Sequence, residues 1–415
     1  MESPSHYSDA YNKPELHNRN FKNDLQVSMQ LNVWTLKPIG TWPKSLGHSR
    51  LETLWCRVSN ITCYGLLVLI LIPGGMYMVL EMKDFYSQLK LGSALSFFMT
   101  AVMKYCAFIL RENDLRRCVE YIEGDWKNVK YTEDRKIMLK NANIGRRLIV
   151  ICGIFMYGAV LFYYVAVPFT RAKIVEEDGN LTYRRLVYPV PKVLVDARRS
   201  PINEIFYFIQ LLSGFVAHNI TVAACGLAAL LAMHACGQLQ VLISWLNHLV
   251  DGREGINDTV DERLANIIEL HVRILNFIAQ TEELLHEISL IEVVGSTMNI
   301  CFLGYHCMME WNFQQPVSGL TYVILLVSLT FNIFMFCYIG ELLTEQTMKV
   351  RESSYMIDWH RLPERKSLAI ILIICMSDAT TRLTAGNIIE LSVSSFGNVI
   401  KSSVAYLNIL RTLTT

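Results

Sequence analysis

Charged residues are scarce in this chain of 415 residues: they make up 18% of it, whereas apolar residues make up 52%. An ordinary soluble domain has about a quarter of its residues charged. The shortage therefore excludes that class and predicts an integral membrane protein. The net charge of +1 also lacks the basic excess that nucleic-acid binding requires, so no nucleic-acid partner is expected.

The N-terminal region lacks the apolar stretch of about 7–15 residues that marks a secretory signal peptide. Residues 1–57 are mostly polar. We therefore expect them to form a cytosolic N-terminal segment.

Motifs for metal binding and catalysis are missing as well. The eleven cysteines match no zinc spacing, and most lie in or beside apolar runs, so neither a metal site nor a disulfide framework is expected. Three histidines stand isolated in apolar runs, with no His-Glu-x-x-His or nucleophile motif beside them: His218, His234 and His306. We interpret them as hydrogen-bonded core residues and expect no enzyme activity and no cofactor.

Long apolar runs take the place of the missing charges. A membrane-spanning helix needs about twenty mostly apolar residues. Six runs meet this requirement, at about 58–80, 91–110, 148–170, 205–236, 288–309 and 317–340. A shorter run at 367–377 is assigned to a helix within a cytosolic region, 341–390, and residues 391–415 complete a seventh crossing. The predicted fold is an all-α membrane protein with seven transmembrane helices.

Lysine and arginine set the direction of these spans, because cytosolic loops carry the excess of both residues. With the N-terminus inside, the cytosolic segments hold 25 basic residues and the outside segments hold 9. The sequence Asn180-Leu181-Thr182 agrees with this direction, since it places a glycosylation site in the longest outside loop. Seven crossings from a cytosolic N-terminus leave the C-terminus extracellular.

Two charged residues, Lys104 and Glu292, interrupt apolar spans near their cytosolic ends. A charge at the centre of a bilayer is unfavourable by a few kcal/mol or more. We therefore expect Lys104 to extend its ammonium group to the membrane interface, and we expect no special role for Glu292.

Residues 260–287 repeat aliphatic side chains at steps of three and four, which predicts an amphipathic helix that runs into the fifth span. Such a helix either lies on the surface of its own subunit or forms contacts between subunits.

The C-terminal part carries an uncommon order of landmarks: Tyr355, Trp359, Leu362-Pro363, Leu383-Thr384-Ala385-Gly386, Lys401-Ser402-Ser403 and Tyr406. This order resembles the C-terminal signature of the insect odorant receptors. The resemblance implies an odorant receptor subunit of a ligand-gated, nonselective cation channel, in the plasma membrane of olfactory sensory neurons. It also implies a tetramer formed with the family's coreceptor, a small volatile ligand and contact with membrane lipid. The resemblance further implies that the cytosolic region 341–390, with the short helix 367–377, is an anchor that holds the tetramer together. The chain lacks the coreceptor's long insertion between the fourth and fifth spans, so it resembles a tuning subunit.

Other receptor and transporter classes fit less well. A gustatory receptor shares the architecture, but its usual Thr-Tyr and Gln-Phe endings are replaced here by Ala405-Tyr406 and Leu410-Arg411. A G-protein-coupled receptor has the opposite orientation and motifs that are missing here. A secondary transporter would show internal repeats, and none is visible.

One face of the last span carries Ser402, Tyr406, Ile409 and Leu413 at steps of three or four residues. Hydroxyl groups at one end and aliphatic groups at the other suit a pore that closes by dewetting, although ordinary helix packing gives the same pattern. In the family that this chain resembles, the last helix of each subunit lines the pore and a hydrophobic residue near the C-terminus forms the gate. The resemblance places that gate at Ile409.

Lys401 is a charge inside the same span. It either supports the ion path, with Asp378, Glu390 or Glu341 as its partner, or fixes the last helix as a buried tether, or extends to an interface.

Aromatic side chains gather in the outer halves of the spans. They suit a pocket for a volatile, mostly apolar molecule, but an interfacial aromatic belt has the same composition. The resembled family places its odorant pocket among the second to sixth spans in the outer half of the membrane. That depth selects these candidate ligand-binding residues: Phe97, Phe98, Phe155, Gly158, Phe162, Tyr207, Tyr305 and Tyr322.

Overall fold

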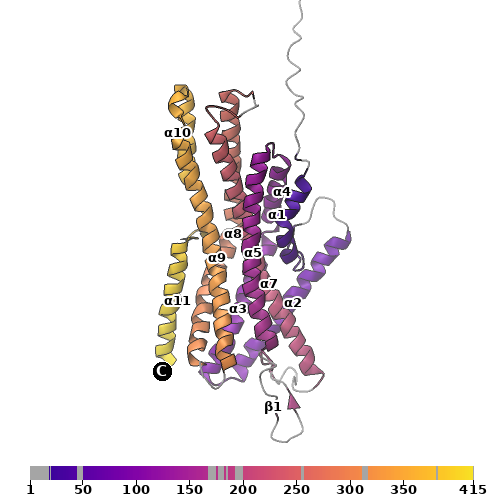
Figure 1. Ribbon diagram of the computed structural model, residues 1–415. Coiled ribbons are helices and arrows are strands. Elements are labelled where there is room, and N and C mark those ends of the chain that lie inside the picture. The colour runs from indigo at the N-terminus through magenta and orange to yellow at the C-terminus, as the bar shows by residue number, and fades with distance from the viewer. Residues whose placement is uncertain are drawn as a thin grey trace, which may run out of the picture.

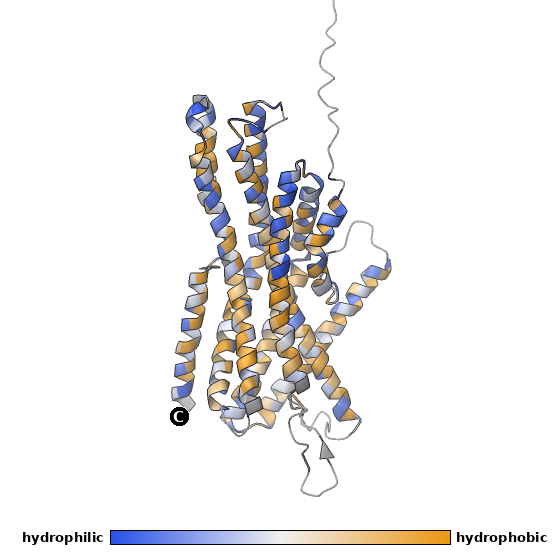
Figure 2. Ribbon diagram, in the orientation of Figure 1, coloured by the Kyte–Doolittle hydropathy of each residue, from blue (hydrophilic) through white to orange (hydrophobic). Residues whose placement is uncertain are grey.

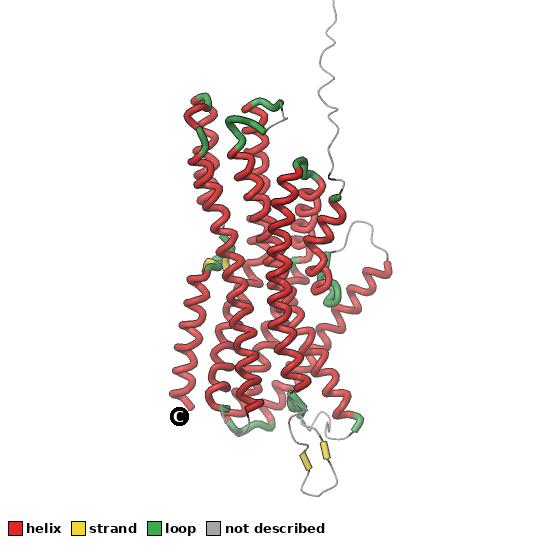
Figure 3. The backbone as a smooth tube through the Cα atoms, in the orientation of Figure 1, coloured by secondary structure: helices red, strands yellow, loops and turns green. Residues whose placement is uncertain are grey.

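The structure is a computed structural model that describes residues 18, 20–43, 50–166, 174–175, 182–183, 186–191, 200–253, 257–310, 316–379 and 382–414. Long helices form an elongated bundle (Figures 1 and 3). Among the described residues, six helices are long and apolar enough to cross a membrane. The chain is therefore an all-α membrane protein, as its composition predicts. The expected glycosylation site, Asn180, lies outside the described residues.

The helices follow one another as α1 (Phe21–Leu36), α2 (Arg50–Leu80), α3 (Phe85–Leu110), α4 (Glu112–Lys127), α5 (Thr132–Leu161), the π-helical turn η1 (Phe162–Ala166), α7 (Ile202–Asn247), α8 (Val260–Met309), α9 (Pro316–Met356), the 3-10 turn η2 (Trp359–Arg361), α10 (Glu364–Ala379) and α11 (Val393–Thr414). Two short antiparallel pairs join β1 (Ile174–Val175) to β2 (Thr182–Tyr183) and β3 (Thr384–Ala385) to β4 (Ile389–Glu390).

Helices α7, α8 and α9 are longer than a bilayer is thick, with 46, 50 and 41 residues. At 1.5 Å per residue they extend about 60–75 Å, against a hydrocarbon core of about 30 Å. Figure 2 shows the consequence: one half of the bundle is largely hydrophobic, and the half that contains α1, α4 and α10 is mixed. Residues 260–287 and the fifth span are one continuous helix, α8. A capping box of Thr259 and Glu262 starts it.

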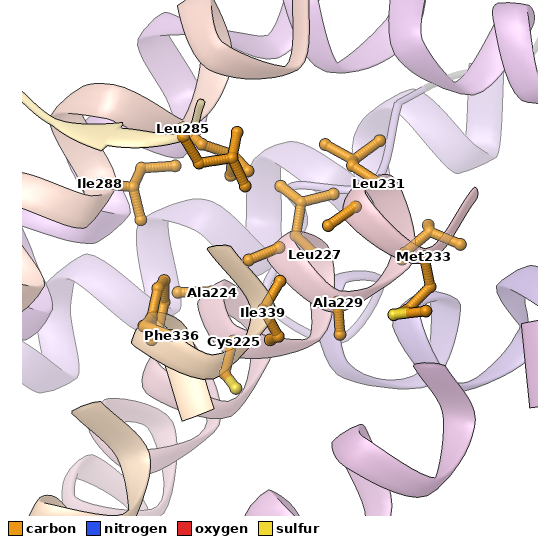
Figure 4. Packing of buried hydrophobic residues seen from close by; sticks show 14 of the residues in the cluster. Ala224, Cys225, Leu227, Ala229, Leu231, Met233, Leu285, Ile288, Phe336 and Ile339 are labelled. Atoms are coloured by element: carbon orange, nitrogen blue, oxygen red, sulfur yellow. The ribbon is translucent and has the colours of Figure 1, made fainter. Parts of the chain in front are cut away.

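Helix α7 is the centre of the bundle and packs against α1, α2, α3, α5, α8 and α9. Its residues from Ala217 to Leu239 are all buried. Many of them are small, and Figure 4 shows them against Leu285, Ile288, Phe336 and Ile339 from α8 and α9. Small side chains let helices approach closely, which is how membrane helices gain packing contacts in place of a hydrophobic driving force.

The structure corrects the interpretation of the two intramembrane charges, Lys104 and Glu292. Lys104 is 2% exposed and points into the bundle, where its ammonium group donates to the Glu292 carboxylate at 2.8 Å. The ammonium also donates to the Thr221 hydroxyl, and the carboxylate accepts from Ser296 and Asn332. Extension to the interface is excluded because α7, α8 and α9 enclose the side chain.

A tight hairpin accounts for the polar break between α10 and α11. Gly386 and Asn387 both have positive φ, 63° and 58°, and the Ile388 amide donates to the Ala385 carbonyl. The hairpin is attached to α8, since the Glu282 carboxylate accepts from the backbone amide of Thr384. The last helix is therefore tied at its start to the long helix α8.

Candidate functional site

A cavity of about 680 Å³ opens among α3, α7, α8 and α9 in the apolar half of the bundle. Residues 186–189, in the connection between α5 and α7, close one side of it. Its volume falls in the range of small-molecule sites, about 300–1,000 Å³. Its walls combine aromatic and aliphatic side chains with hydroxyl, amide and charged groups, so it suits a small ligand that has both apolar and polar parts.

The floor of the cavity is formed by His218 of α7, Asn299 of α8 and Ser328 of α9. The imidazole of His218 packs against the ring of Phe97, with centroids 4.7 Å apart. Its Nδ1 lies 2.9 Å from the carbonyl oxygen of Gly214, one helical turn back. An apolar run on a helix thus places a single imidazole at the bottom of an aromatic chamber.

The connection between α5 and α7 contributes a wall that the sequence did not suggest. Tyr188 is 7% exposed, although it belongs to a loop rather than a span. Its backbone amide and carbonyl both bond to the side chain of Gln210, and its hydroxyl lies 2.9 Å from that of Tyr164. Its ring meets Phe98 edge to face, with centroids 5.5 Å apart. In the sequence, only Pro189 and Pro191, which both follow Tyr188, hint at a fixed conformation here.

An ion pair lies at the rim of the cavity, where Lys90 of α3 meets Glu310 after α8. The Tyr86 hydroxyl donates to the same carboxylate at 3.1 Å. The Lys90 ammonium also stands over the Tyr322 ring, 5.7 Å from its centroid. These four side chains link α3, α8 and α9 at one end of the cavity.

Of the candidate ligand-binding residues, Phe97 and Tyr322 line the cavity. Phe98 and Tyr305 are buried behind its wall, each 1% exposed. The Tyr207 hydroxyl donates to the backbone carbonyl of Tyr164.

The three candidates on the third span lie elsewhere. Phe155 stacks on Phe331, with centroids 4.3 Å apart, and remains 37% exposed. Gly158 is exposed, and Phe162 begins the turn η1. None of the three lines the cavity. The polar residues His218, Asn299 and Ser328 line the cavity instead.

Helix α11 stands at the side of the bundle against α8 and α9 (Figure 1). Ser402, Tyr406 and Ile409 are exposed on it, while Ser403 is buried and donates to the Thr297 carbonyl of α8. The burial of Leu413 lies outside what the structure describes. Among the described residues of the single chain, no helix covers the predicted pore face of α11.

Lys401 is exposed and forms no ion pair with any described residue. Of its expected partners, Glu390 pairs with Arg382, and Glu341 accepts from the Val393 amide. The side chain of Asp378 lies outside the described part.

The three histidines of the apolar runs have different surroundings. His218 bonds to its own helix, and the Nε2 of His234 lies 2.9 Å from the Asp125 carboxylate. His306 packs against the rings of Tyr86, Tyr305 and Tyr322, at centroid distances of 5.5–5.7 Å. Within the described ranges, no three His, Cys, Asp or Glu residues come together to hold a metal ion.

Sequence and structure comparisons agree on the relatives of the chain. A family model described as 7tm Odorant receptor matches residues 89–404. Odorant receptor 10 of Aedes albopictus is 22% identical over 218 residues, which cover 52% of this chain and 57% of that protein. The insect olfactory receptor OR5 of Machilis hrabei has a similar fold, with a TM-score of 0.76 at 15% identity over 94% of this chain and 99% of that one. The structure of OR5 in complex with eugenol matches with the same TM-score over 95% of this chain and 100% of that one.

Proposed function

The chain belongs to the insect odorant receptor family, and from that premise we propose that it is the odorant-binding subunit of a ligand-gated cation channel formed with the family's coreceptor. The cavity of about 680 Å³ carries this proposal, because it is large enough for a volatile molecule and has aromatic and aliphatic side chains in its walls. OR5 of Machilis hrabei, which shares the fold, binds eugenol. That likeness supports a ligand site in this chain.

The orientation and the pore belong to the same proposal. The N-terminus and the long extensions of α7, α8 and α9 are cytosolic, α11 is the seventh crossing, and the C-terminus is extracellular. The last helices of four subunits surround the pore, α11 among them, and Ile409 is the gate residue of this subunit. Ser402 and Tyr406 face the water-filled part of the pore, and Lys401 points away from the pore axis. The exposed apolar face of α11 supports this arrangement, since it lacks a cover within the described chain.

Ligand binding opens the channel only if the open state binds the odorant more tightly than the closed state. The hairpin at Thr384 gives a route for this difference, because it ties the start of α11 to α8, and α8 also lines the cavity. A shift of α8 around a bound odorant would therefore move the pore helix.

Whole-cell recordings test the proposal. We expect an odorant panel to evoke cation current in cells that carry this chain with the coreceptor, and not in cells that carry this chain alone. The variant Ala94→Phe fills the cavity from α3 and should abolish the current with surface expression intact. Met99→Phe is the matched control, because Met99 is 52% exposed on the same helix and lies outside the cavity. Silence of the surface-expressed pair across the panel, or current that Ala94→Phe leaves unchanged, would contradict the proposal.

A further inference from the structure

A hydrogen bond to the Gly214 carbonyl oxygen fixes the tautomer of His218. A carbonyl oxygen can only accept a hydrogen bond, so the Nδ1 that lies 2.9 Å from the Gly214 carbonyl must carry the proton. The ring is 8% exposed and has no carboxylate paired with it in the described part of the chain. An unpaired imidazolium is unfavourable in such a place, so the ring is neutral and its Nε2 is an acceptor.

The neighbouring polar groups are already engaged. The Asn299 oxygen accepts from Ser96, and its amide nitrogen donates to the Gly295 carbonyl. The Ser328 hydroxyl donates to the Phe155 carbonyl. Over the described ranges, no donor reaches the His218 Nε2, although His218 lines the cavity. The floor therefore presents an acceptor to a ligand that would have to bring its own donor.

Aromatic groups surround this acceptor. Phe97 packs directly against the imidazole, and Tyr163, Tyr188 and Tyr322 form further parts of the wall. Rings of this kind favour a flat, apolar ligand body by offset or edge-to-face contact. The chamber thus places the Nε2 acceptor of His218 beside aromatic rings.

We propose that the cavity selects aromatic alcohols and phenols, whose hydroxyl donates to Nε2 of His218 while the ring packs between Phe97 and the tyrosines. This inference rests on the proposed function, since it names the ligand class of the same site. The corresponding methyl ether, which is larger by one methyl group, has no donor and leaves the Nε2 without a partner. One neutral hydrogen bond in a buried site then corresponds to about a tenfold preference for the hydroxyl compound.

Direct binding tests the inference apart from channel gating. The full-length chain in lipid nanodiscs is titrated with 1-naphthol and with 1-methoxynaphthalene, and binding is followed by the fluorescence of the naphthalene ring. We expect 1-naphthol to bind about ten times more tightly. In His218→Phe the ring is kept and the acceptor is lost, so the ratio of the two dissociation constants should fall to about one.

His248→Phe is the matched control. The Nδ1 of His248 also bonds to a carbonyl one turn back, that of Ser244, but at the opposite end of α7, away from the cavity. This variant should keep the preference of the unmodified chain. Thermal unfolding of both variants checks that they fold.

The outcomes separate the inference from the proposed function. Equal affinity for the two compounds, a preference that survives in His218→Phe, or no binding of 1-naphthol would overturn the inference. Odorant-evoked current from other compounds would then leave the proposed function standing. A hydroxyl preference that depends on His218, without current in the presence of the coreceptor, would support the inference and contradict the channel proposal.

Discussion

Lys104 and Glu292 form an ion pair inside the bundle, with the ammonium nitrogen 2.8 Å from the carboxylate, although they stand 188 positions apart in the chain. Two hydroxyl partners of this pair lie about one helical turn below the cavity floor. Thr221, which accepts from Lys104, is three residues after His218, and Ser296, which donates to Glu292, is three residues before Asn299. A closed polar layer therefore underlies the site.

Breaking this pair should destabilise the folded receptor. Glu292→Gln leaves Lys104 charged and buried without a counter-ion, which costs about 3 kcal/mol or more. The double variant Lys104→Met with Glu292→Gln removes both charges and should recover part of that loss. The unfolding temperatures of the single and the double variant are measured in detergent by size-exclusion chromatography after heating. A double variant less stable than Glu292→Gln would contradict this account.

The hairpin before α11 should tolerate substitution at only one of its two left-handed positions. Gly386→Ala places a methyl group at φ 63°, about 2.7 Å from Leu290, and the backbone conformation alone costs about 1–2 kcal/mol. Asn387→Gly, at φ 58°, is the control and should change stability little. Folded yield and thermal unfolding compare the two. An equal loss of stability in both variants would show that the left-handed conformation of Gly386 is not the cause of the destabilisation.

Acid should loosen the attachment of helix α1. The side chain of Asp24 is 1% exposed, and two hydrogen bonds from Arg135 on α5 hold its pKa below the ordinary value of 3.8. The pair therefore stabilises the fold at neutral pH, and the contribution disappears as pH falls through the depressed pKa. Unfolding temperatures of the unmodified chain and of Asp24→Asn should differ at neutral pH, and the difference should shrink as the pH falls below 3.8. A gap that stays constant across this range would refute the linkage.

Shortening the proposed gate should make the channel leak. Ile409 is 57% exposed on α11 in the single chain, and Ile409→Ala widens an apolar constriction, which favours wetting. We expect a larger current without ligand in cells that also carry the coreceptor. Val404→Ala is the control, since Val404 is also exposed but lies on another face of the helix. Equal basal currents from both variants and the unmodified receptor would argue against Ile409 as the gate.

Hydropathy by itself predicted the class of fold, because the bilayer requires each span to be a helix of a minimum length with satisfied backbone groups. The C-terminal landmarks predicted the family, which the match over residues 89–404 establishes. The order of residues also indicated the amphipathic start of α8 and the short helix α10. These are local properties, so they can be read along the chain.

The tertiary structure decided which distant side chains meet. No periodicity indicates that Lys104 points toward Glu292, or that Tyr188 of a loop enters the bundle and bonds to Gln210. Depth in the membrane selected Phe155 and Gly158 as candidates, but depth does not fix the rotation of a helix, and both face outward. No pattern in the sequence places His218 at the cavity, because a binding site depends on contacts between segments that the sequence keeps far apart.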